Sequence, residues 1–411
     1  MLEWKIVDEV EPAQSEPPPA ARWRRWGWLW VATLLLVAVG HLLWFWLQVQ
    51  EGRLQADIAD AVLREERALR GDVVTERWYT LSDPDAPADW QEGYHVSFAH
   101  AYDELPMPQI MVLALADDRA LVQLTYESEV LDWQTLRAYR LVGQEWRRTP
   151  VDGFLQKNQR AMMGQGERFQ VVASEENIQF LEKHPEWWLD VGALQEHLQT
   201  TWPVSCAECS LYLTIHPQEF TPFTLAPTTA PDRLPLLIPS PWLFQPDWDS
   251  PLPPANQYRL AVAAAVVAAH TYPRNASGQG RLPVGDGLAL LRMLQQAEAR
   301  QWALDESEHR AVRNEWRLEL NGQWPTPFEG PLPTTLEDPQ PEERERWLAV
   351  NLLLEKQMAL AGPETPGTLA AILLSYDPSL FRWERFFQAL IGGSMSDLES
   401  LSRDYVLTME P

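Results

Sequence analysis

Residues 26–47, WGWLWVATLLLVAVGHLLWFWL, decide how this chain is organised, because they contain no charged side chain over 22 positions. As an α-helix this stretch is about 33 Å long, enough for the roughly 30 Å hydrocarbon core of a bilayer. Its tryptophans gather at the two ends, where indole rings favour the headgroup level. They are Trp26, Trp28, Trp30, Trp44 and Trp46. We therefore expect a transmembrane helix over residues 26–48.

The orientation of this helix follows from Arg22, Arg24 and Arg25, which stand just before it. Positively charged residues next to a span stay in the cytoplasm. We expect a short cytoplasmic tail over residues 1–25, disordered because it is short and proline-rich. Everything after Gln48 is then extracytoplasmic. A cleavable signal peptide is the less favoured alternative, because the apolar run is long and no small-residue cleavage site follows it.

Composition limits what the exported part can do. The 411 residues carry 33 basic and 58 acidic side chains, a net charge of -25, which disfavours a nucleic-acid partner. The length predicts two to three folded domains. The basic side chains include only four lysines, an arginine bias that is typical of a GC-rich genome and leads us to expect a bacterial envelope protein.

The segment after the span continues a helical pattern, with apolar residues at Leu54, Ile58, Val62 and Leu69. We expect a stalk helix over residues 49–71, with a dimerising coiled coil as the alternative. Residues 72–152 then change to a two-residue period, which predicts an antiparallel meander of three or four strands.

A helix before a curved meander that ends in a Gly-x-x-Trp strand resembles the nuclear-transport-factor-like (SnoaL-like) cone fold. This resemblance implies a small α+β domain over residues 72–152, with a pocket for a small molecule. His95, His100, Asp103 and Glu104 precede the sheet and are candidates to face such a pocket; the alternative is that they are solvated turn residues.

After a glycine-containing linker at residues 163–166, the pattern is strand, helix, two strands and helix, followed by a mainly helical C-terminus. We expect strands at residues 168–174, 211–216 and 234–239. The expected helices are 175–201, broken at Pro185, then 257–272, 287–304, 342–360, 365–374 and 396–405. The element order and the closing W-x-x-h-h … G-x-S-x-x-x-h-E … Y pattern resemble the peptidase-MA-like gluzincin metallopeptidases over residues 167–411.

The zinc chemistry of that family is missing from this sequence. Gluzincins bind zinc through His-Glu-x-x-His on one helix, with the glutamate activating a water molecule. No such motif occurs here, and the matching helix, AVAAAVVAAH at residues 261–270, carries only His270. We therefore expect a degenerate domain with no zinc, no other cofactor and no catalytic residues.

Cys206 and Cys209 are the two cysteines of the chain. Because we place them outside the cytoplasm, we predict a small structural disulfide between them. A redox motif is less favoured, since the pair precedes a strand rather than opening a helix. Half of a zinc site is a further alternative, for which His197 and His216 are the nearby additional ligands.

Residues 235–254, PLLIPSPWLFQPDWDSPLPP, contain seven prolines and the aromatic residues Trp242, Phe244 and Trp248. Exposed aromatics between fixed prolines would make a docking surface for a protein or glycan partner. The alternative is that these rings fold back onto the domain.

The sequence thus predicts an α+β, single-pass, cytoplasm-in membrane protein with a non-catalytic binding or structural role in the envelope. An enzyme is the first alternative, either a divergent gluzincin-type hydrolase or one using the cone domain. A transmembrane signalling regulator is the second.

Overall fold

The computed structural model describes residues 19–70, 78–97, 106–116, 118–127, 132–151, 159–163, 169–202, 208–216, 219, 224–225, 233–247, 250–271, 284–320, 332–333, 340–362, 365–376, 381–391 and 400. The chain divides into two units, residues 1–61 and 62–411.

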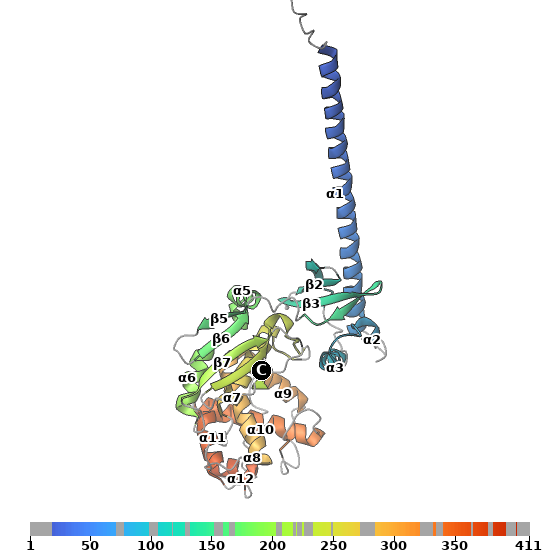
Figure 1. Ribbon diagram of the computed structural model, residues 1–411. Helices are drawn as coiled ribbons and strands as arrows, with labels where there is room; N and C mark the ends of the chain where they lie inside the picture. Colours follow the sequence, from blue (N-terminus) through green and yellow to red (C-terminus); the bar gives the residue numbers. More distant parts are fainter. Residues whose placement is uncertain are drawn as a thin grey trace, which may run out of the picture. The chain divides into compact units, whose positions relative to one another are not determined.

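Helix α1 (Pro19–Leu69) is one uninterrupted helix of 51 residues (Figure 1). It begins seven residues earlier than expected, so residues 19–25, including the three arginines, are helical rather than part of an irregular tail. Every described side chain from Trp30 to Val49 is exposed to solvent. Among the described residues, α1 is the one helix long and apolar enough to cross a membrane, with a mean hydropathy of 1.9 over its most apolar window.

The second unit begins with the last two turns of α1, from Val62. Val62 and Leu69 are buried, as are the two glutamates between them. The end of α1 is therefore part of the second unit. The expected end of the stalk, residue 71, lies just past the last residue of α1, Leu69. The short helices α2 (Trp78–Leu81) and α3 (Ala88–Ser97) come next.

The predicted meander is a four-stranded antiparallel sheet, which we call sheet A. Its strands, β1 (Gln109–Ala116), β2 (Arg119–Glu127), β3 (Asp132–Val142) and β4 (Glu145–Thr149), pair in chain order. A bulge interrupts the β1–β2 register between Val112 and Ala114. Gly143 has a φ of 68°, which suits a glycine in the tight β3–β4 turn.

A second sheet, sheet B, has the strand order β5-β6-β7-β9-β8. Its centre, β6 (Phe169–Ser174), β7 (Ser210–His216) and β9 (Arg233–Pro239), is parallel. The edge strands β5 (Gln159–Met163) and β8 (Thr224–Leu225) are antiparallel and were not expected. Helices α5 (Glu175–Lys183) and α6 (Val191–Thr201), with η2 (Pro185–Trp187) between them, connect β6 to β7. The expected break at Pro185 is therefore confirmed.

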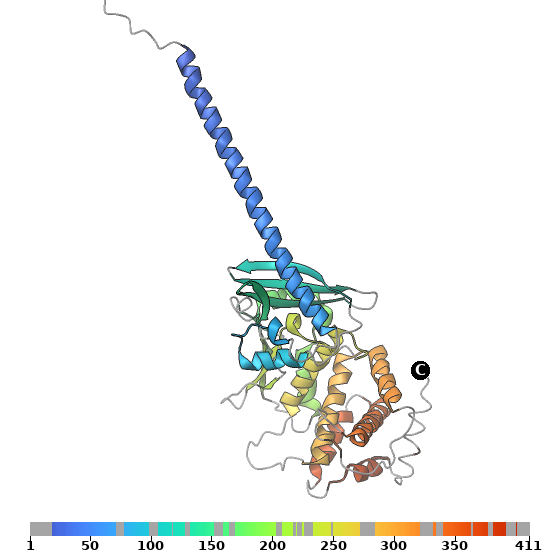
Figure 2. The ribbon, with the colours of Figure 1, turned by 90° about the vertical axis from the view of Figure 1, so that its right-hand side faces the viewer.

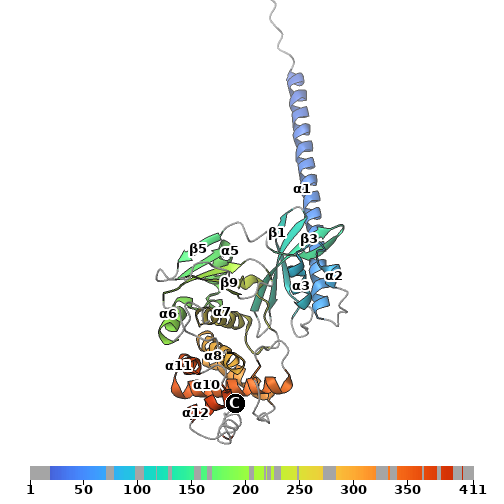
Figure 3. The same ribbon diagram turned by 60° about the horizontal axis from the view of Figure 1, so that its bottom comes forward.

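Helices follow sheet B to the end of the described chain. After η3 (Pro241–Leu243), α7 (Pro254–Thr271) packs between β9 and α8 (Asp286–Ala303), as Figure 3 shows. The others are α9 (Glu306–Glu319), α10 (Pro341–Ala361), α11 (Thr365–Ser375) and α12 (Trp383–Ile391). Of these, α10, α11 and α12 pack against α8, and α9 packs against α10; they are the orange and red helices of Figure 2. The helix expected at residues 396–405 lies outside the described residues, apart from residue 400.

Candidate functional site

Two glutamates at the end of α1 form the start of a buried ionic cluster. Glu65 and Glu66 are each only 2% exposed, although the helical stripe seen in the sequence is apolar. The Tyr126 hydroxyl donates a hydrogen bond of 2.7 Å to Glu66, and the Tyr139 hydroxyl donates one to Glu65. A buried carboxylate needs such donors, because water no longer solvates it.

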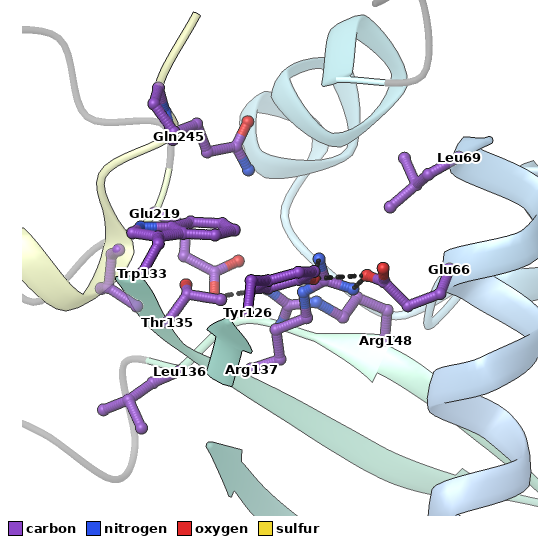
Figure 4. A pocket seen from close by; sticks show the side chains of 12 residues that line it. Glu66, Leu69, Tyr126, Trp133, Thr135, Leu136, Arg137, Arg148, Glu219 and Gln245 are labelled. Carbon is purple, nitrogen blue, oxygen red and sulfur yellow. Dashed lines mark hydrogen bonds and ion pairs between the residues drawn. The ribbon is translucent and has the colours of Figure 1, made fainter. Parts of the chain in front are cut away.

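Sheet A supplies the opposite charge. Arg137 and Tyr139 are two residues apart on β3, so their side chains point to the same face of the sheet. Arg137 Nη1 lies 2.7 Å from Glu66 Oε1 and 3.5 Å from Glu65 Oε2, and its Nη2 donates to the Tyr126 hydroxyl at 3.1 Å. Figure 4 shows the Tyr126 hydroxyl pointing to the Glu66 carboxylate, with Arg137 and Arg148 beside them.

A third carboxylate arrives from a distant part of the chain. Glu219, in the segment after β7, is 5% exposed and lies 2.8 Å from Arg148 Nη2 of β4. The indole N–H of Trp90 on α3 donates a hydrogen bond of 2.9 Å to the same carboxylate. Arg148 Nε is also 3.5 Å from Glu65, so this arginine lies between two glutamates. The cluster therefore joins α1, α3 and sheet A to the chain that follows β7.

The electrostatics of the two pocket carboxylates differ. Burial would raise the pKa of Glu66, but Arg137, Tyr126 and Arg70 outweigh it and hold that pKa below its usual value. Burial raises the pKa of Glu219, even though Arg148 and Trp90 both favour its ionised form. Two carboxylates whose environments shift their pKa values in opposite directions are typical of acid–base pairs.

Glu66 and Glu219 line one small pocket, whose empty space is about 440 Å³ when the part open to solvent is included. Its apolar wall includes Trp133, which stacks on Tyr126 with 4.7 Å between ring centroids, and Leu243 from η3. Gln245 and Pro246 lie at the same pocket (Figure 4). Because Arg137 and Arg148 already pair with glutamates, a ligand would have to compete with these internal pairs.

A further buried carboxylate, outside the ionic cluster, lies on α8. Glu298 of α8 is fully buried and accepts hydrogen bonds from the indole N–H groups of Trp202, at 3.0 Å, and Trp302, at 3.2 Å. His197 Nε2 of α6 is 2.9 Å from the same carboxylate. His197, considered above as a zinc ligand beside the cysteines, is thus engaged with Glu298.

The remaining candidates for metal and redox chemistry are placed as follows. Cys209 is fully buried and disulfide-bonded, whereas Cys206 lies outside the described residues, so their pairing stays a prediction. His270 is buried on α7 with 1% exposure, and His216 ends β7. Within the described ranges, no group of three or more His, Cys, Asp or Glu side chains could hold a metal ion.

Two of the proposed docking aromatics pack against the protein. Trp242 is half-buried, and its ring centroid lies 4.5 Å from that of Phe180. Phe244, also half-buried, lies edge-on to Tyr258 at 5.3 Å. Both rings therefore pack in part against the protein, and the hypothesis that they also dock a partner stays a prediction. Trp248 lies outside the described residues.

Only some of the residues predicted to meet the membrane or the cone pocket have described side chains. Trp30, Trp44 and Trp46 are between 57% and 65% exposed. Trp26, Trp28, Arg22, Arg24 and Arg25 lie in α1, but their side chains are not among those described. His95 is exposed on α3 beside Trp78, with 5.0 Å between ring centroids, and does not line the pocket. His100, Asp103 and Glu104 lie outside the described residues.

Sequence reasoning missed the ionic cluster entirely. Its arginines follow the two-residue period of β3 and β4, and reading which polar positions fall on the inner face could have identified Arg137. Glu219 had no such signal, because the sequence around it predicted neither a strand nor a helix. Comparison with protein-family models, with curated proteins and with solved structures finds no match.

Proposed function

We propose that this protein is a single-pass membrane protein with a cytoplasmic N-terminus, whose extracytoplasmic part has a binding or structural role in the cell envelope. The exposure of α1 carries the proposal. Its large apolar side chains from Trp30 to Val49 are between 36% and 73% exposed. Leaving so much contiguous apolar surface in water is unfavourable, whereas the same surface is stable in lipid.

A signal sequence is the competing interpretation of the same helix. The length of α1 favours an anchor, since the apolar run exceeds the 7–15 residues of a signal core. The burial of Val62 and Leu69 also gives the distal part of α1 a role in the folded unit. The part of α1 from Val62 onward would then stay in the folded unit whether or not the segment before it were cleaved.

A structural or binding role is supported by how the charged groups of the cluster are used. Glu65, Glu66 and Glu219 pair with Arg137 and Arg148, and Arg70 pairs with Glu66. Three carboxylates and three guanidinium groups therefore compensate one another inside the protein. Such a network stabilises one arrangement of the end of α1 from Val62 on, sheet A and Glu219.

Catalysis is the second candidate function, and one observation favours it. Glu66 and Glu219 line one pocket with pKa values shifted in opposite directions, as a general base and a general acid require. This arrangement would suit small-molecule chemistry in the cone domain rather than zinc-dependent hydrolysis. A signalling role remains a third proposal, in which the short N-terminal tail reports on the exported part.

The anchor is tested by fractionation and by reporter fusion with the full-length chain. We expect the protein to stay in the membrane after alkaline carbonate extraction, with an intact N-terminus by mass spectrometry. A reporter active only outside the cytoplasm should work when fused after Pro411. A mature chain that begins after Leu47, or an active cytoplasmic reporter at Pro411, would exclude the proposed topology.

The non-catalytic role is tested by metal analysis of the full-length protein purified in detergent. We expect substoichiometric zinc, with no change after incubation with zinc and dialysis. Glu66→Gln and Glu219→Gln should alter thermal stability in step with any change in biological function. Stoichiometric zinc would support the hydrolase alternative. A functional loss in either variant at unchanged stability would support cone-domain catalysis.

A further inference from the structure

The β1 edge of sheet A is apolar, and no described strand pairs with it. Within the described residues, β1 pairs with β2 on one side and with no strand on the other. Met111, Leu113 and Leu115 of β1 are between 43% and 59% exposed, and Met107 just before the strand is 49% exposed. An edge strand with free backbone groups and apolar side chains is a template for pairing with another strand.

Edge strands are usually protected by charges, prolines or bulges. The sequence of β1, QIMVLALA, has neither a charge nor a proline. Its single protective feature is the bulge, which leaves Leu113 without a partner in the β1–β2 register. β1 thus lacks the usual features that prevent pairing along most of its length.

We propose that β1 pairs with β1 of a second copy of this chain, in antiparallel orientation about a two-fold axis perpendicular to the strands. The eight residues are self-complementary when Val112 lies opposite Leu113 of the second copy. In that register Ile110 faces Leu115, and Met111 faces Ala114. Six of the eight positions thus pair apolar with apolar, and the outermost pair sets the polar Gln109 opposite Ala116. The two sheets then form one sheet of eight strands.

The charge of the chain limits where two copies can meet. Two chains that each carry a net charge of -25 repel one another. The uncharged edge of β1 lets two copies approach without placing like charges opposite each other. A self-paired strand is a small interface, so association depends on the high local concentration of two anchored chains. That last step rests on the proposed membrane anchor.

The register is tested with two differently tagged full-length chains, one carrying Val112→Cys and the other Leu113→Cys, co-expressed and reconstituted in lipid nanodiscs. Mild oxidation should give a covalent dimer that contains both tags, because cross-strand neighbours lie close enough for a disulfide. Leu318→Cys on α9, 77% exposed, is the matched control and should give far less of the product. Equal cross-linking of the control and the β1 pair would overturn the proposal.

The energetics are tested by the dimer fraction of full-length chains in nanodiscs, counted by single-molecule photobleaching. Leu113→Lys should weaken dimerisation about tenfold or more, since each interface then receives two lysines in an apolar strip. Met111→Lys should act similarly, whereas Leu318→Lys should not. Both β1 side chains are exposed, so the thermal melting of each variant should match that of the parent.

Three results would exclude self-pairing through β1. One is a monomeric parent chain in nanodiscs; another is a dimer unaffected by Leu113→Lys and Met111→Lys. The third is a dimer lost on substitution of Leu54, on the helical stripe of α1, but retained in both lysine variants, which would place the contact on the helix. Carbonate extraction of the same variants separates these outcomes from failure of the anchor itself.

Discussion

Gly367 of α11 faces the backbone of Thr201 so closely that a β-carbon at position 367 would lie 2.5 Å from the Thr201 carbonyl oxygen. That oxygen belongs to the backbone at the end of α6 and cannot move by itself. Gly367→Ala should therefore push α11 away from α6 and lower the free energy of unfolding by about 1–3 kcal/mol. Chemical denaturation measures this effect.

The matched control for that substitution is Gly192→Ala on α6, where the added β-carbon meets Asp190 Oδ1 at an ordinary 3.5 Å. We expect this variant to be neutral or slightly stabilised, because alanine favours helix over glycine. If both variants had the same stability, the close approach of α11 and α6 would be excluded.

Arg148 and its neighbour Arg147 should respond very differently to the same substitution. Arg148→Met leaves Glu219 and Glu65 buried without this cation, which should cost about 3–5 kcal/mol of unfolding free energy. Arg147 is partly exposed and lies 3.5 Å from Glu145, so Arg147→Met should change stability by about 0.5 kcal/mol or less. Adding Glu219→Gln to Arg148→Met should recover part of the loss. Equal effects of the two arginine substitutions would contradict a buried cluster.

Glu355 should stabilise the folded protein more at neutral pH than in acid, below the pKa that its carboxyl has in the unfolded chain. Burial opposes ionisation, but Arg300 at 2.9 Å and His309 outweigh it and lower the pKa of Glu355 from 4.5 to about 2. A lowered pKa stabilises the folded chain above the unfolded value, and this contribution is lost as pH falls from 4.5 towards 2. It corresponds to roughly 3 kcal/mol at neutral pH. Glu355→Gln should remove that acid-sensitive part, whereas Glu345→Gln at an exposed position should not.

Glu298 should have the opposite pH dependence. Burial raises its pKa, although the N–H groups of Trp202, His197 and Trp302 favour the ionised form. The folded chain then holds this proton more tightly than the unfolded chain does. The resulting stability is complete below the unfolded pKa and is lost as pH rises through the folded value. The melting temperature should fall less steeply with rising pH for Glu298→Gln than for the parent or for the exposed control Glu306→Gln. A steeper fall in the variant would reverse the assigned sign.

Cys206 and Cys209 should be oxidised in protein taken directly from the cell envelope. Mass spectrometry under non-reducing, alkylating conditions should find no modified thiol, since Cys209 is disulfide-bonded. The loop that this bridge closes is very small, so replacing both cysteines by serine should cost about 2–3 kcal/mol or less. Two alkylated thiols would exclude the bridge. Loss of function at unchanged stability would support a redox role instead.

Much of the secondary structure could be predicted because its patterns are local. The four strands of sheet A follow a two-residue period with short turns, and they form the antiparallel meander that this period predicted. Helix α9 was missed because its buried side chains are only Val312 and Trp316 in a strongly charged segment. The capping box between Asp305 and Glu308 was a readable start signal for it. Strand β5 was missed because it lies directly before the glycine linker.

The candidate site could not be predicted in the same way, because it depends on pairs that are far apart in the chain. The hydroxyl of Tyr139 meets Glu65 across 74 positions, and Arg148 meets Glu219 across 71. A helical wheel places Glu65 beside the apolar stripe and cannot tell whether an arginine from a sheet will cover it. Burial of these charges is decided by tertiary packing, which no local period records.

The position of Glu219 has a consequence for folding while the chain is being synthesised. Glu65 and Glu66 emerge first, the arginines of sheet A follow, and Glu219 comes only after β7. Leu243, which packs with Leu121 and Leu136 of sheet A, emerges later still. An N-terminal fragment that ends at residue 152 would therefore expose Arg148 and part of its apolar core to water and to chaperones or proteases. The core of sheet A can therefore be completed only when about 90 further residues have been synthesised, so sheet A cannot finish folding before sheet B has begun to form.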